Sequence, residues 1–216
     1  MGAGRLLRRT ALAAMLAAAP ALHAQPAGER TRDNALTVYG ALRDGGSFIE
    51  RDSDRKLRVD GSSAGAVSVD LGLDGARQLQ FFLSQQRSDL RLDGASAAAA
   101  TTPARLPLTV TYLHLGGTNF FDVPIGRGPY VAGGIGATLL RPGRDGFGSE
   151  LRPSLNIGLG WQQPLGSVFA LRLEARGYFT LVESSGGLFC DAGCVVQIKG
   201  DAFTQGEVQI GLSARF

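Results

Sequence analysis

The chain has 216 residues, among them 22 lysines and arginines, 19 aspartates and glutamates, 31 glycines and two cysteines. Two cysteines are too few to hold together a small disulfide-built domain. Three of the basic residues, Arg5, Arg8 and Arg9, lie within the first 24 residues, so the rest of the chain has 19 charges of each sign. A balanced chain offers no basic face for nucleic acid, and that class of partner is excluded.

The N-terminal segment has the pattern of a secretion signal. Its three arginines precede an alanine- and leucine-rich stretch over 10–19, and Pro20 is followed by Ala-Leu-His-Ala, which has the small residues of a signal peptidase site. A transmembrane anchor is the competing interpretation, but it needs about 20 strongly apolar residues, and this stretch is shorter. We therefore predict a signal peptide over 1–24, a short periplasmic segment over 25–34 and one domain over 35–216.

After residue 24 no apolar stretch is long enough for a membrane helix, so a membrane-spanning protein would have to be a closed barrel. Alternation of polar and apolar residues supports this, because it recurs about eight times at nearly the length of a membrane strand. The segments are 35–43, 63–73, 77–91, 106–118, 129–140, 151–162, 169–179 and the end of the chain at 207–216. In 77–91, Gln85 and Arg87 interrupt the apolar face, which predicts a bulge or an early exit from the bilayer.

The connections between these segments alternate in length. Short or moderate connections lie at 74–76, 119–128 and 163–166, and longer ones at 44–62, 92–105, 141–149 and 183–200. Membrane barrels have short periplasmic turns and longer external loops. The pattern predicts an all-β, eight-stranded antiparallel up-and-down transmembrane barrel with both termini in the periplasm and four external loops.

Alternation alone does not decide which face is inside. A secreted soluble barrel of the lipocalin type would turn its apolar face inward around a ligand. The position of the aromatic residues favours the membrane barrel, because they gather near strand ends, as an interfacial girdle would. The predicted girdle comprises Phe120, Phe121, Tyr130, Trp161, Phe169, Phe179 and Phe216.

The polar face of the barrel would then line a narrow lumen. Arg172, Glu174 and Arg176 alternate along one segment, and Glu207 lies on the polar face of the neighbouring terminal segment, with Asp70 on that of the second. Opposite charges at this spacing can pair across an enclosed interior. We predict a charge cluster of Asp70, Arg172, Glu174, Arg176 and Glu207 that acts either as a structural plug or as a pore constriction.

Catalysis and metal binding have little support in the sequence. A serine nucleophile needs a base beside it, and the only histidine after the leader, His114, shares the parity of Leu108, Val110 and Tyr112, which we interpret as the lipid-facing side. A kink near Gly116 could turn it inward. Cys190 and Cys194 lie in the last predicted loop and are expected to form a local disulfide in an oxidising compartment, while two thiols alone are a poor metal site.

Three motifs carry a family resemblance. They are Pro-Tyr-Val-Ala-Gly-Gly-Ile-Gly at 129–136, Asn-Ile-Gly-Leu-Gly-Trp at 156–161 and Ala-Leu-Arg-Leu-Glu-Ala-Arg-Gly-Tyr-Phe at 170–179. In this order, with a final aromatic residue, they resemble the small outer-membrane β-barrel proteins, which include the barrel domain of outer-membrane protein A and its single-domain relatives. The likeness extends over about 129–216.

The resemblance implies a bacterial outer-membrane protein without a fixed activity, because a fold does not decide a function. Our first hypothesis is a non-enzymatic, monomeric envelope protein with surface loops and a filled lumen, which needs no cofactor. The alternatives are a narrow channel for small or hydrophobic solutes and a lipid-modifying enzyme. The expected partners are outer-membrane lipid, lipopolysaccharide and the barrel-assembly machinery, which would meet the terminal strand ending at Phe216.

Overall fold

The computed structural model describes residues 32–49, 56–92, 105–121, 124–144, 147–182, 187–188, 196–197 and 202–216. The predicted signal peptide and the two cysteines lie outside these residues. The strands are β1 (Ala35–Arg43), β2 (Ser47–Ile49), β3 (Lys56–Val59), β4 (Ser62–Gly72), β5 (Arg77–Leu92), β6 (Arg105–Phe120), β7 (Gly128–Pro142), β8 (Glu150–Pro164), β9 (Phe169–Leu181), β10 (Gly187–Leu188), β11 (Val196–Gln197) and β12 (Ala202–Arg215). Among the described residues, no helix is long and apolar enough to cross a membrane.

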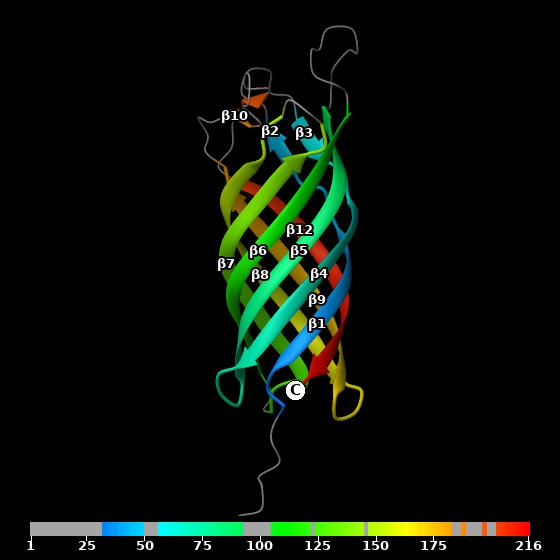
Figure 1. Ribbon diagram of the computed structural model, residues 1–216, viewed down its shortest axis with the longest axis vertical. Helices are drawn as coiled ribbons and strands as arrows, with labels where there is room; N and C mark the ends of the chain where they lie inside the picture. The colour runs from blue at the N-terminus through cyan, green and yellow to red at the C-terminus, as the bar shows by residue number, and fades with distance from the viewer. Residues whose placement is uncertain are drawn as a thin grey trace, which may run out of the picture. The chain divides into compact units, whose positions relative to one another are not determined.

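Eight of these strands form a closed antiparallel barrel, which confirms the predicted fold. The order around the barrel is β1, β4, β5, β6, β7, β8, β9 and β12. The last strand pairs with both β9 and β1, and the pairing of β1 with β12 runs from Ala35 opposite Arg215 to Arg43 opposite Glu207. Because the first and last strands join, the sheet has no free edge along this seam (Figure 1).

The outer face of the barrel is apolar and the inner face is largely polar. In β9, Arg172, Glu174 and Arg176 are buried, whereas Leu173 and Phe179 are exposed. The other strands show the same alternation, as in β1 and β12, where every second side chain is buried. A soluble barrel with an apolar interior would have the opposite polarity, so the lipocalin-type alternative is wrong and the transmembrane arrangement holds.

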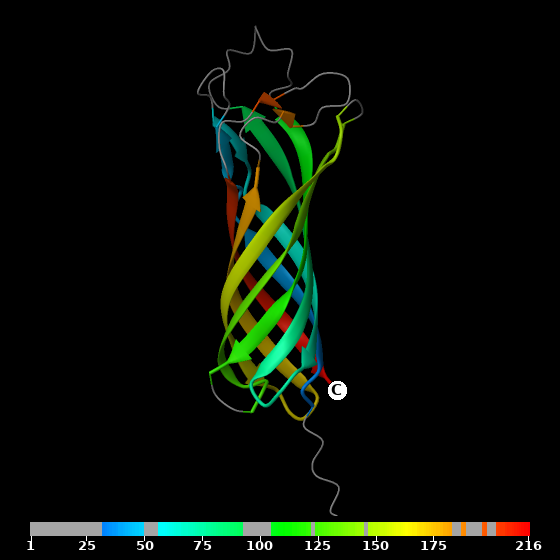
Figure 2. The same ribbon diagram turned by 90° about the vertical axis from the view of Figure 1, so that its left-hand side faces the viewer.

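Short turns and long connections lie at opposite ends of the barrel. The turns β4–β5, β6–β7 and β8–β9 lie at the end where β1 begins and β12 ends, which we call the turn end, and the opposite end is the loop end (Figures 1 and 2). In the β8–β9 turn, Gly166 has φ +115°, a conformation that residues with a side chain rarely adopt. At the same end, the amide of Phe216 donates to the carbonyl of Asn34 at 3.0 Å.

The bulge considered for 77–91 is absent from β5. Its residues pair one to one with β6 from Arg77 opposite Asn119 to Arg91 opposite Arg105. Gln85 and Arg87 are exposed on the outer face because the 16-residue strand continues past the apolar band. Here β3 adds to the same sheet, with Val59 opposite Leu90.

Candidate functional site

The lumen holds three ion pairs between nearly inaccessible side chains. Asp70 of β4 contacts Arg172 of β9 at 2.8 Å, and Glu174 contacts Arg176 of the same strand at 2.5 Å. The third pair joins Arg43 of β1 to Glu207 of β12 at 2.6 Å. All five residues of the predicted charge cluster therefore face inward, and the three cations and three anions balance.

Neutral side chains join the first two ion pairs into one network. The amide nitrogen of Gln80 donates to Asp70 at 2.7 Å, and its oxygen accepts from Nη2 of Arg176 at 3.0 Å. Glu174 also accepts from the hydroxyl of Tyr130 and from the amide of Gln209, each at 2.8 Å. Hydrogen bonds of this kind offset the cost of removing the charges from water.

Aromatic rings cover the faces of the buried arginines. The guanidinium of Arg43 lies 4.9 Å from the ring centre of Tyr112 and 4.8 Å from that of Tyr178. That of Arg176 lies 3.9 Å from the ring centre of Phe82. Cation–π contacts of this kind are strongest when both groups are shielded from water, so the rings stabilise the charges and fill the space between them.

The loop end of the lumen is more apolar than its middle, although it holds one partly buried ion pair of β8, Arg152 with Glu150 at 3.1 Å. Buried apolar side chains from five strands, with Val182 just after β9, lie here as part of a larger cluster: Val59, Leu90, Leu106, Leu108, Val110, Leu140, Val182 and Phe203. Outside it, the same stretch of β5 and β6 carries Arg87, Arg91 and Arg105, with Arg91 paired to Asp60 at 2.6 Å. This part of the barrel has the polarity of a soluble protein, which is what a portion standing in water requires.

His114 faces the lumen, so its assignment to the lipid side is wrong. The side chain is 2% exposed, its ring stacks on that of Tyr112 at 5.6 Å, and Nε2 lies 3.0 Å from Oγ of Ser154. His114 does share a face of β6 with Leu108, Val110 and Tyr112, but this apolar face points into the barrel and not toward lipid. The histidine turns inward through the regular alternation of β6 and needs no kink.

The aromatic residues assigned to one girdle divide between the two faces. Phe120 and Tyr130 are buried inside the turn end, with ring centres 5.3 Å apart, so their girdle assignment is wrong. They occupy inward positions of β6 and β7, and Tyr130 also hydrogen-bonds Glu174. The outer face carries the others, namely Phe121, Trp161, Phe169, Phe179 and Phe216.

Sequence reasoning missed Arg43, Gln80 and the four lumen tyrosines, which are Tyr39, Tyr112, Tyr130 and Tyr178. Arg43 had a usable signal, because it ends the first alternating segment on the face opposite Leu36, Val38 and Leu42. In the part of the chain that the structure describes, no three histidine, cysteine or carboxylate side chains gather as a metal site would require.

Comparisons with known proteins give similarity in structure alone. No protein-family model and no curated protein sequence matches the chain. Neisserial surface protein A is similar to it with a TM-score of 0.55 and 12% identity, covering 85% of this chain and 97% of that one. The outer-membrane protein AlkL, solved in lipid bilayers, has a TM-score of 0.53 and 13% identity, covering 85% of this chain and 90% of that one. Together with the closed eight-stranded topology and the apolar exterior, these similarities show that the chain has the fold of the small bacterial outer-membrane β-barrel proteins.

Proposed function

We propose that this protein is a non-enzymatic integral outer-membrane barrel whose lumen is closed and whose loop end serves envelope structure or surface contact. The observation that supports the proposal is the filled interior. Three buried ion pairs occupy its middle, and an apolar cluster lies toward the loop end. An eight-stranded barrel is only wide enough for its own side chains. Such an interior leaves the loops and the outer face as the surfaces for interaction.

The loop end supports the second part of the proposal. There the β5–β6 pair continues past the apolar band, and β3 extends the sheet. Since this portion is largely apolar inside and charged outside, it forms a base in water from which loops can meet a partner. Lipopolysaccharide and surface molecules of other cells are the partner classes that this position would serve.

The placement of His114 and Ser154 does not favour an enzyme. The two side chains are a hydrogen bond apart, but Nδ1 of the histidine has no hydrogen-bond partner among the described residues. A base that activates a serine is normally oriented by a third group at that nitrogen. Ser154 is also only 6% exposed inside the lumen, where a lipid substrate has no approach.

Conductance across a planar bilayer tests the closed lumen. We expect purified protein, inserted after its heat-modifiable gel migration has shown that it is folded, to give no steady ion current. A persistent ohmic current from the wild type would overturn the proposal and favour the narrow channel. Mass spectrometry of lipid A from expressing cells tests the enzyme, and a change in acylation that disappears in His114→Ala would contradict the non-enzymatic assignment.

A further inference from the structure

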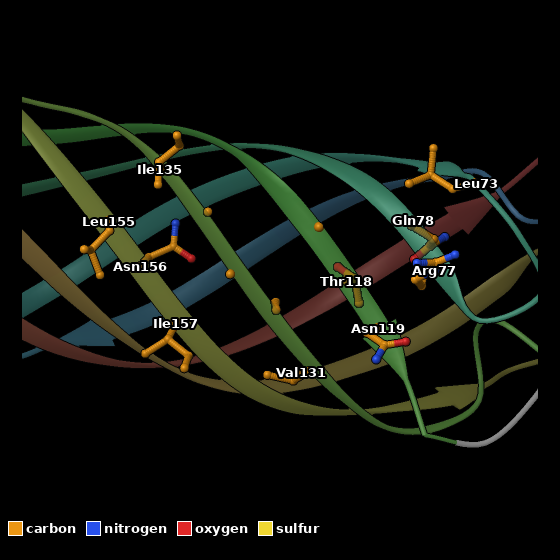
Figure 3. A pocket seen from close by; sticks show the side chains of 14 residues that line it. Leu73, Arg77, Gln78, Thr118, Asn119, Val131, Ile135, Leu155, Asn156 and Ile157 are labelled. Carbon is orange, nitrogen blue, oxygen red and sulfur yellow. The ribbon is translucent and has the colours of Figure 1, made fainter.

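The outer face of β6, β7 and β8 has a groove that the closed lumen does not explain. It has a volume of about 630 Å³, and Figure 3 shows its lining side chains reaching from Leu73 and Arg77 at the turn end to Ile135 and Leu155. Pockets that hold small organic ligands lie in the same range of volume. The lining is mostly apolar, with Arg77 and Asn119 at the turn end.

A pair of glycines creates the groove. Gly117 of β6 and Gly133 of β7 are opposite each other on the outward face, in a row that continues to Ile157 of β8. The next row toward the loop end has Leu115, Ile135 and Leu155. Two adjacent positions without side chains therefore lie beside a ridge of leucine and isoleucine.

The groove has room for a large part of one lipid chain within one leaflet. Val131 is opposite Asn119 at the turn-end rim, and Ile135 is four residues farther along β7. Four residues of a strand span about 13 Å, which is close to half of the roughly 30 Å hydrocarbon thickness of a bilayer. Because barrel strands tilt by about 35–45°, a chain that entered beside Asn119 and followed β7 would stay within the hydrocarbon of that leaflet.

The rim supplies polar groups where a lipid has its headgroup. Arg77 and Asn119 are opposite each other on the outward face. The guanidinium contacts Asp74 through Nε at 2.6 Å and Nη2 at 2.5 Å, and its side chain is 68% exposed. A guanidinium has five N–H donors and suits the geometry of phosphate, so donors remain for a second anion.

We infer that this groove is a binding site for a single glycerophospholipid of the leaflet at the turn end. One acyl chain lies over Gly117 and Gly133, against Ile135 and Ile157, and the phosphate accepts hydrogen bonds from Arg77. The apolar floor and the N–H donors of Arg77 and Asn119 at the rim are complementary to the two parts of such a lipid. Because the groove lies on the outer face, this inference does not depend on whether ions pass through the lumen.

Native mass spectrometry of the folded barrel, extracted in detergent and supplied with phosphatidylethanolamine, tests the site. We expect the wild type to retain one lipid and Gly133→Leu to lose it, because a Cβ at 133 meets only the carbonyl of Asn156, at 3.4 Å, and the larger side chain fills the groove. The matched control is Gly40→Leu. Gly40 also faces outward opposite a glycine, Gly65, with nothing within 4 Å of an added Cβ.

The headgroup contact is tested with a variant at the rim that leaves Gly117 and Gly133 of the floor unchanged. The wild type is expected to retain phosphatidylethanolamine in preference to a diacylglycerol with the same chains, and Arg77→Gln to lose this preference. Arg87→Gln, at the other end of β5, is expected to keep it. Equal retention by all variants, no retained lipid in the wild type, or a dimer of the wild type that Gly133→Leu abolishes would each overturn the inference.

Discussion

At the scale of single residues, we expect the stability of the barrel to depend strongly on the ion pair of Arg43 and Glu207. Both side chains are fully buried, and Glu207 also accepts from the hydroxyl of Tyr178 at 2.8 Å. Replacing Glu207 by leucine leaves a buried guanidinium without its carboxylate. We expect this variant to lose about 3–5 kcal/mol of the free energy of unfolding, measured by urea denaturation of the barrel in lipid vesicles.

The double variant Arg43→Leu with Glu207→Leu separates the lost pair from the isolated charge. Replacing both members of a buried ion pair by apolar residues is often nearly neutral. We therefore expect the double variant to recover most of the stability that the single variant loses. A double variant that stays as unstable as Glu207→Leu would show that loss of the pair, and not the uncompensated cation, accounts for the effect.

Residue-level prediction from the sequence succeeded where neighbouring strands alternate clearly. Arg172, Glu174 and Arg176 stand between leucines and alanines, so their inward direction follows from parity alone. Partners across the barrel could not be read in the same way. Glu207 is opposite both Arg43 of β1 and Arg176 of β9 in the register, and alternation alone does not say that it pairs with Arg43.

At the scale of elements, the β4–β5 turn depends on one carboxylate. Oδ1 of Asp74 accepts from the amides of Ala76 at 3.0 Å and Arg77 at 2.9 Å, and Oδ2 accepts from the guanidinium of Arg77. The hydrogen bond from the Arg77 side chain, followed by that from the Ala76 amide, lowers the pKa of Asp74 from 3.8 to about 2. The ionised form therefore favours the folded turn.

The sign of the pH dependence follows from that lowered pKa. Stability from Asp74 is complete above its ordinary value of 3.8 and is lost as the pH falls toward 2. We expect the difference in unfolding free energy between the wild type and Asp74→Asn to shrink over this interval, as measured by urea titrations at each pH. A difference that stays constant from pH 5 to pH 2 would contradict the role of the ionised carboxylate.

Strand β6 shows why the sequence alone does not always reveal which face of a strand points inward. Leu106, Leu108 and Val110 are buried on one face, whereas Leu113 and Leu115 are exposed on the other. Both faces are thus apolar, and the choice between them depends on which part of the barrel stands in lipid. Alternation predicted the extent of β6 as 106–118, within two residues of Arg105–Phe120, but which face points inward needed the register with β5 and β7.

At the scale of the whole molecule, the barrel changes polarity along its axis. Its middle has a charged interior and an apolar exterior, whereas its loop end has a largely apolar interior, with one partly buried ion pair, and charged side chains outside. Each portion matches a different solvent, lipid in the first case and water in the second. The boundary between them therefore marks the edge of the bilayer on the loop side.

Spin labels on the outer face locate this edge. Arg87 of β5 and Leu113 of β6 both face outward, and Leu113 is opposite Leu83, four residues or about 13 Å along β5 from Arg87. In vesicles, a label at Arg87→Cys should collide with a water-soluble nickel complex, and labels at Leu113→Cys and Leu83→Cys with dissolved oxygen, all in a Cys190→Ser and Cys194→Ser background. If the Arg87 label were as shielded from nickel as the other two, the apolar band would extend to the loop end, and the proposed base for surface contact would lie within the membrane.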